Sequence, residues 1–91
     1  MIYNVTFSDE AERDVKKMKR NEPLSYKKLL RLLLELQTHP KTGTGQIEKL
    51  KHCKEETWSR RISSKHRLVY RIYDDIVEVL ILSAWGHYDE K

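Results

Sequence analysis

Cysteine is almost absent from this sequence, which has one such residue, Cys53, among 91. One cysteine excludes an internal disulfide framework and any paired-cysteine metal motif. Long apolar runs are also lacking, and no segment approaches the roughly 18 consecutive apolar residues that span a bilayer. No basic and apolar leader precedes residues 2–7, which alternate between apolar and polar. These absences favour a cytoplasmic protein that does not engage a membrane.

Familiar catalytic signatures are equally scarce. No GxSxG nucleophile motif occurs, and the four histidines lack the close spacing that metal sites need. Gly43 and Gly45 lie close together, but no GK[ST] follows them, so a plain flexible loop is favoured over a phosphate-binding loop. The classes of enzyme that these motifs define therefore receive no support.

Positive charge is unevenly distributed along the chain. The formal net charge is +4, but residues 41–71 hold nine basic and three acidic residues, whereas residues 72–91 hold one basic and five acidic residues. A basic band of this kind suits a polyanion or an acidic protein as partner. An ordinary solvated surface explains a charge excess of this size equally well.

The length predicts one domain, spanning residues 1–91. Alternating apolar and polar residues predict strands, and apolar residues at three- and four-residue spacing predict helices. The order is one strand, two helices and four strands, which predicts an α+β fold with a two-helix hairpin packed on a mostly antiparallel sheet. Strands are expected within 2–7, 46–52, 57–63, 66–73 and 76–82, and helices from Ser8 to a break at 20–23 and over about 22–38.

The second predicted helix is the most apolar segment of the chain. We expect Asn21 to cap it and Pro23 to lie in its first turn. A leucine stripe at helical spacing is more often core than a dimer seam. The stripe consists of Leu29, Leu32, Leu33 and Leu36, widened by Leu30 and Leu34.

A scattered set of polar residues is suited to cutting a phosphodiester without a metal. RNA supplies its own nucleophile, the 2′-OH. An enzyme then needs a base near that hydroxyl, a cation on the phosphate and an acid for the leaving 5′ oxygen. An aromatic ring can stack on a base. The residues of these types are Glu48, Arg61, Arg67, His87 and Tyr88.

Each of these residues also has an ordinary interpretation. The glutamate can be the solvated partner of the lysine that follows it, the arginines can be surface charges of a hairpin, and the terminal pair can cap a sheet edge. The relation between Arg61 and Arg67 depends on the loop of that hairpin. An odd number of loop residues places both side chains on one face, and a loop of two places them on opposite faces. The sequence pattern leaves both arrangements open.

Three stretches of the chain resemble a known family. They read GTGQIEKLKH at 43–52, WSRRISSKHRLVYRI at 58–72 and HY at 87–88. The first is similar to the G-x-G-x-x-E-x-L-K-H loop and strand of the YoeB-like (Txe) toxins in the RelE/ParE superfamily. The second is similar to their W-S-R-R-I-x-x-x-H-R-L-V-Y hairpin. The resemblance spans the chain in length and element order and is strongest over 43–73.

This resemblance implies the toxin of a type II toxin–antitoxin module, a ribosome-dependent endoribonuclease that cuts mRNA in the A site without a cofactor. It also implies a cognate antitoxin whose C-terminal segment wraps the toxin, and toxins of this kind are often dimeric. The implied site residues are Glu48 as general base, Arg67 on the phosphate, His87 as general acid, Tyr88 as the tyrosine that positions the substrate, and Lys51 and Arg61 as further phosphate contacts.

The chain departs from the family pattern near residue 88. Gly86 directly precedes His87, and Asp89, Glu90 and Lys91 follow the tyrosine at which many family members stop. Two other functions remain open. One is a ParE-like toxin that binds a protein such as DNA gyrase, and the other is a non-catalytic module that binds RNA or the ribosome. A pure binder has no need of a placed base and acid.

Overall fold

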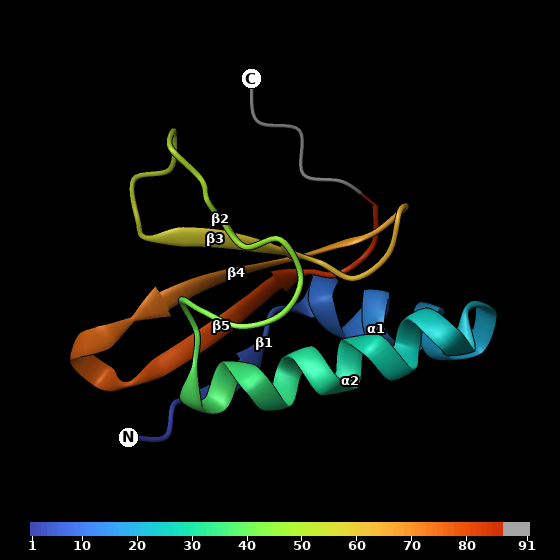
Figure 1. Cartoon of the computed structure of the whole chain (residues 1–91), viewed down its shortest axis with the longest axis horizontal. Coiled ribbons are helices and arrows are strands. Elements are labelled where there is room, and N and C mark those ends of the chain that lie inside the picture. The colour runs from blue at the N-terminus through green and yellow to red at the C-terminus, as the bar shows by residue number, and fades with distance from the viewer. Residues whose placement is uncertain (87–91) are drawn as a thin grey trace.

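The computed structural model describes residues 1–86, and over this range a five-stranded sheet carries two helices on one of its faces (Figure 1). The strand order is β1-β5-β4-β3-β2, in which β1 is parallel to β5 and the other neighbours are antiparallel. The predicted α+β fold is therefore confirmed. Its elements are β1 (Asn4–Phe7), α1 (Asp9–Asn21), α2 (Pro23–Thr38), β2 (Glu48–Lys49), β3 (Thr57–Arg61), β4 (Arg67–Tyr73), a 3-10 turn (Asp74–Ile76) and β5 (Glu78–Ser83).

Ser8 ends the first strand and begins the first helix. Its Oγ accepts a hydrogen bond from the N–H of Ala11 at 3.0 Å and donates one to the carbonyl of Leu82 in β5 at 2.9 Å. The first turn of α1 also carries acidic side chains, which suit the positive end of a helix dipole. The predicted N-cap is confirmed, and the same hydroxyl ties the start of α1 to the sheet.

A single residue, Glu22, joins the two helices. The prediction that Asn21 caps the second helix is wrong, because Asn21 is the last residue of α1 and Glu22 occupies the cap position of α2. Pro23 follows as the first residue of α2, where a missing N–H costs nothing. The Glu22 carboxylate does not cap the helix and instead contacts Ser25 and His66.

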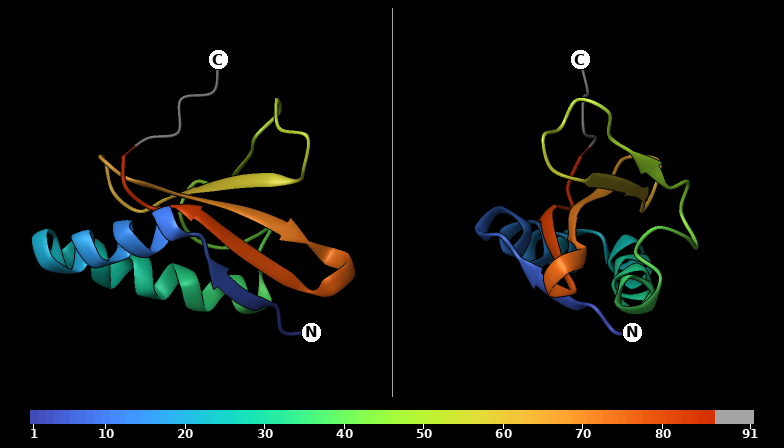
Figure 2. Two further views of the ribbon diagram at one scale, coloured as in Figure 1. Left: turned by 180° about the vertical axis from the view of Figure 1, so that it is seen from behind. Right: turned by 90° about the vertical axis from the view of Figure 1, so that its left-hand side faces the viewer.

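The core lies between the helices and the sheet, and both helices cover the same side (Figure 2). Leu29, Leu32 and Leu36 are fully buried there. The prediction that Leu30 and Leu34 widen this buried stripe is wrong, because their side chains are 43% and 66% exposed. Successive residues are rotated by about 100° around the axis of a helix, and the sheet covers only one side of α2. The leucines that follow the buried ones by one or two positions therefore lie away from the sheet. Neither helix of residues 1–86 is long and apolar enough to cross a bilayer.

The β3–β4 hairpin has a loop of residues 62–66, which is an odd number, and Arg61 pairs directly with Arg67. The two arginines therefore lie on the same face of the sheet. Ser63 shapes this loop, because its Oγ accepts hydrogen bonds from the N–H groups of Lys65 and His66, at 3.2 Å each.

Alternation divides the side chains of β3 and β4 between two faces. One face packs on the helices and includes buried Leu68, Tyr70 and Ile72. The other is turned away from the helices, and we call it the open face. On β3 and β4 the open face consists of Thr57, Ser59, Arg61, Arg67, Val69, Arg71 and Tyr73, and the strand register adds Glu48 of β2 beside Ser59.

Candidate functional site

The open face brings residues from three strands into one row. Glu48 of β2 lies opposite Ser59 of β3, and the Oγ of Ser59 accepts a hydrogen bond from Nε of Arg67 in β4 at 3.0 Å. Directly opposed residues in antiparallel strands have Cβ atoms about 5 Å apart. The structure thus places two of the predicted site residues, Glu48 and Arg67, on one face, with a buried serine between them.

The Arg67 guanidinium is held by two bonds. Its Nε donates to Ser59, and its Nη2 donates to the backbone carbonyl of Gln46 at 2.7 Å. A guanidinium has five N–H donors, so two bonds fix its plane while leaving capacity for an anion. The side chain is half-buried, which strengthens its interaction with a negative charge.

Gln46 connects both arginines of the open face to the segment that leads into β2. Its backbone carbonyl accepts from Arg67, and its side-chain Oε1 accepts from Nη1 of Arg61 at 3.3 Å. The residue has φ of 43°, in the left-handed region that costs a non-glycine residue about 1 kcal/mol or more. Two residues later the chain reaches Glu48, so the same loop positions the carboxylate and the arginines.

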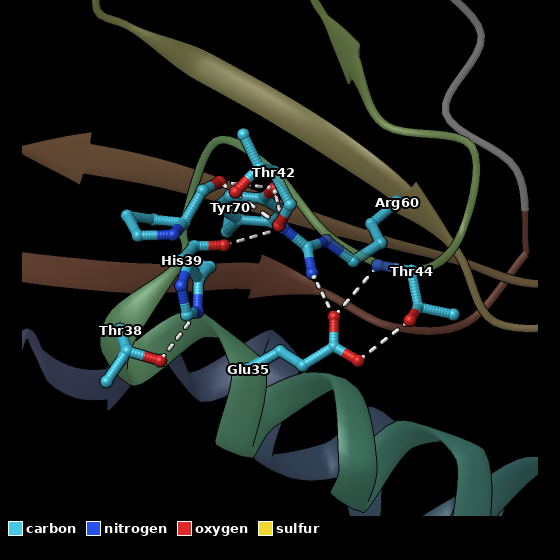
Figure 3. A network of polar contacts seen from close by, with 8 residues as sticks. Glu35, Thr38, His39, Thr42, Thr44, Arg60 and Tyr70 are labelled. Atoms are coloured by element: carbon cyan, nitrogen blue, oxygen red, sulfur yellow. Dashed lines mark hydrogen bonds and ion pairs between the residues drawn. The ribbon is translucent and has the colours of Figure 1, made fainter.

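An ion pair between buried Arg60 and half-buried Glu35 anchors this loop to α2 (Figure 3). Arg60 is fully buried, and its Nη1 donates to Oε1 of Glu35 at 3.0 Å. Its Nη2 donates to the carbonyls of His39 and Thr42 at 3.0 and 2.9 Å. Thr44 donates its N–H and its hydroxyl to the Glu35 carboxylate, at 2.9 and 2.8 Å. The backbone bond from Thr44, followed by its hydroxyl and the charge of Arg60, lowers the pKa of Glu35 against the opposing effect of burial.

The two glycines of this loop are needed for close approach. Gly43 and Gly45 have φ of 115° and 102°, and a Cβ on Gly45 would lie 2.7 Å from the carbonyl oxygen of Arg61. The carbonyl of Gly45 also accepts a hydrogen bond from the N–H of Arg61. The segment is therefore tied to α2 through Thr44 and to β3 through Gly45.

Lys51 lies beyond the end of β2, outside the row of Glu48, Ser59 and Arg67. It lines a hollow of about 470 Å³ together with Lys49, Leu50, Cys53, Lys54, Glu55 and Glu56. Within residues 1–86 no contact joins Lys51 to Arg67. Arg61, by contrast, lies directly opposite Arg67 and shares Gln46 with it.

His87 and Tyr88 lie outside the described residues. The last described residue, Gly86, has its carbonyl 2.9 Å from the N–H of Arg67. Gly86 therefore lies beside the arginine of the candidate site. Among the side chains of residues 1–86, no three histidine, cysteine or acidic groups lie close enough together to hold a metal ion.

Sequence reasoning missed Ser59 and Gln46. Ser59 carried a usable signal, because it alternates with Arg61 along β3 and so shares the face of Arg67 once the hairpin loop is odd. Gln46 carried none, because its part depends on a left-handed conformation and on a backbone carbonyl.

Known proteins are similar to this chain in sequence. The family model described as the YoeB-like toxin of bacterial type II toxin–antitoxin system matches residues 7–88. The toxin YoeB of Escherichia coli (strain K12) is 35% identical over 82 residues, which cover 90% of this chain and 95% of the relative.

Solved structures agree in fold and extent. The YoeB dimer from Staphylococcus aureus superposes with a TM-score of 0.83 at 34% identity, covering 97% of this chain and 100% of the other. The YoeB-YefM complex from the same organism has a TM-score of 0.79 at 36% identity, with the same coverage. These matches include the stretches that carry Glu48 and Arg67.

Proposed function

Because this chain belongs to the YoeB-like toxins of bacterial type II toxin–antitoxin systems, we propose that it is an endoribonuclease that cuts mRNA in the ribosomal A site by acid/base catalysis. The observation that carries the proposal is the row of Glu48, Ser59 and Arg67 across the open face. It places a carboxylate and an oriented guanidinium on one face, and these are the types of base and phosphate-binding group that attack by a 2′-OH requires.

The reaction begins at the ribose 2′-OH. Glu48 takes the hydroxyl proton as general base, and the 2′ oxygen forms a bond to phosphorus. Arg67 donates to the non-bridging phosphate oxygens and stabilises the negative charge that develops on them. The bond from phosphorus to the 5′ oxygen then breaks, and His87 gives its proton to that oxygen. The products are a 2′,3′-cyclic phosphate and a 5′-OH.

The remaining predicted site residues complete the proposal. The family match extends through residue 88, which supports His87 as the acid and Tyr88 as the ring that positions the substrate. Arg61 adds positive charge opposite Arg67. Lys51, in the lysine-lined hollow, contacts phosphates farther along the RNA or on the ribosome.

The proposal includes two protein partners. The solved relatives comprise a YoeB-YefM complex and a YoeB dimer, both from Staphylococcus aureus. This chain accordingly binds a cognate antitoxin that blocks its site, and it forms a homodimer.

Cleavage mapping on ribosomes programmed with a defined mRNA tests the proposal. The expected result is one cut within the A-site codon, with a 5′-OH on the downstream fragment, and loss of cutting in Glu48→Gln and Arg67→Ala. Arg71→Ala is the matched control, because Arg71 lies on the same open face and donates to Thr57 as Arg67 does to Ser59.

Two outcomes would favour the other functions. Tight ribosome binding without a cut indicates a non-catalytic binding module. Growth arrest that persists in a variant combining Glu48→Gln, Arg67→Ala and His87→Gln indicates a ParE-like toxin that acts by binding a protein. Products ending in a 3′-OH would contradict attack by the 2′-OH.

A further inference from the structure

His66 is a buried histidine at the end of the β3–β4 loop, one residue before Arg67. Its side chain is 3% exposed, and its ring lies against Trp85 with a centroid separation of 4.3 Å. Trp85 in turn contacts Lys17, whose Nζ lies 4.2 Å from the ring centroid. A buried imidazole must satisfy its ring nitrogens, so its partners show what it does.

Both ring nitrogens of His66 have partners, and the partners fix the tautomer. The backbone N–H of Gly86 lies 2.8 Å from Nδ1 and can only donate, so Nδ1 presents its lone pair. Nε2 lies 2.9 Å from Oε2 of Glu22. The bond from His66 lowers the pKa of the Glu22 carboxyl, which keeps it ionised and able to accept. The neutral ring therefore carries its proton on Nε2 and donates it to Glu22.

Gly86 is held at both of its backbone polar groups. Its N–H donates to the side chain of His66, and its carbonyl accepts from the N–H of Arg67 at 2.9 Å. The two residues that hold it are neighbours at the start of β4, and the side chain of Arg67 lies on the open face. The point from which the chain continues to His87 is thus attached to the phosphate-binding residue of the proposed site.

We propose that His66 is a positioning residue for RNA cleavage, which holds the backbone of Gly86 beside Arg67, the proposed phosphate-binding residue. This inference rests on the proposed function. His66 does not contact the reacting atoms and acts through the backbone of Gly86. Glu22, in the link between the helices, supports it by fixing the proton on Nε2.

Two substitutions separate this role from simple packing. In His66→Asn the amide oxygen replaces Nδ1, because it lies the same number of bonds from Cα, and the acceptor for Gly86 is kept. In His66→Gln the longer amide reaches toward Glu22, and the acceptor for Gly86 is lost. Both variants lose the ring that packs on Trp85, so a purely structural role would affect them alike.

The test combines the two variants with a measurement on the wild-type protein. In ¹⁵N-labelled wild type, a scalar coupling across the hydrogen bond is expected between the Gly86 amide nitrogen and Nδ1 of His66. In single-turnover cleavage on saturating programmed ribosomes, His66→Gln is expected to slow the cleavage step about tenfold, which corresponds to one lost hydrogen bond of about 1.4 kcal/mol. His66→Asn is expected to stay within about threefold of wild type, and both variants are expected to bind ribosomes with unchanged affinity.

Equal rates for the two variants would overturn the inference, as would the absence of the Gly86–His66 coupling in wild type. A loss of ribosome affinity with an unchanged cleavage rate would also overturn it. A wild-type protein that binds ribosomes and never cuts them would refute the proposed function and this role with it. The coupling, which is measured without RNA, distinguishes that failure from a failure of the contact itself.

Discussion

The carbonyl oxygen of Gln46 lies 2.7 Å from Nη2 of Arg67, so a residue in the left-handed conformation orients the central cation of the open face. The second restraint on the guanidinium is Oγ of Ser59, at 3.0 Å from Nε. Both restraints belong to segments next to Glu48, one earlier in the chain and the other across the sheet. The position of Glu48, the proposed base, and that of Arg67, the proposed phosphate-binding group, are therefore coupled.

Arg67→Lys is expected to abolish most cleavage while leaving the fold intact. A lysine keeps the charge but cannot bind Ser59 and Gln46 and still present a planar fork to a phosphate. Losing such a positioned donor costs about 2.7–4 kcal/mol of transition-state stabilisation, or a rate loss of about 10²–10³. Single-turnover cleavage of ribosome-bound mRNA measures this loss of rate. Arg71→Lys should cleave at the wild-type rate, and equal losses in the two variants would contradict the assignment.

Ser59→Ala is expected to lower both stability and cleavage. It removes the buried hydroxyl that accepts from Arg67, at a cost of about 1 kcal/mol in the free energy of unfolding. Without this acceptor the guanidinium of Arg67 is less firmly oriented, so cleavage should also be several-fold slower. Thr57→Val is the control, because Thr57 accepts from Arg71 in the same way and also donates to the carbonyl of Glu55. Urea unfolding should show a loss for Thr57→Val at least as large as that for Ser59→Ala, whereas only Ser59→Ala should slow cleavage.

Gly45→Ala is expected to destabilise the protein strongly. The left-handed φ of 102° costs an alanine about 1 kcal/mol, and the clash of its Cβ with the Arg61 carbonyl adds about 1–3 kcal/mol. Gly86→Ala isolates the first effect, because Gly86 has φ of 79° and no atom within 4 Å of the added Cβ. Thermal and urea unfolding compare the two. Equal losses of stability in the two variants would mean that the close approach of Gly45 to the Arg61 carbonyl does not require a glycine.

Glu35 is expected to make stability fall in acid. Its folded pKa lies below the ordinary value of 4.5, chiefly because of the Thr44 N–H bond, so its stabilising contribution is present above 4.5 and is lost as pH falls through the folded pKa. Glu35→Gln should therefore be less stable than wild type at pH 7, and the difference should narrow towards pH 3. Urea midpoints across this range measure it, and a difference that is constant with pH would refute the role of the charge.

Alternation along the strands predicted most of this fold correctly. Alternation showed which residues within each strand share a face. Whether the polar residues of β3 and those of β4 lie on the same face depended on the number of residues in the loop between them. That length is set by the hydroxyl of Ser63, which receives two backbone N–H groups and closes the turn. The relation between Arg61 and Arg67 therefore depended on a local hydrogen bond that strand periodicity does not report.

The buried polar groups were harder to predict for a different reason. Arg60 alternates with Trp58 and so falls on the helix face, which signals a buried charge that must have a partner. The partner, Glu35, is 25 residues earlier on a helix, and sequence spacing does not identify it. His66 carried a similar signal, because it alternates with Leu68 and Tyr70 on the apolar face. Its partner nitrogen, the backbone N–H of Gly86, has no sequence signature at all.

Strand β5 follows every other element of residues 1–86 in the chain, yet it lies between β1 and β4. During synthesis β1 has no strand to pair with until residues 78–83 have been made, so the early chain cannot close its sheet. The contact between Arg67 and Gly86 forms later still. A nascent chain therefore cannot make the contact that ties Gly86 to Arg67 until residue 86 has been translated, so the order of synthesis delays this restraint on the proposed site.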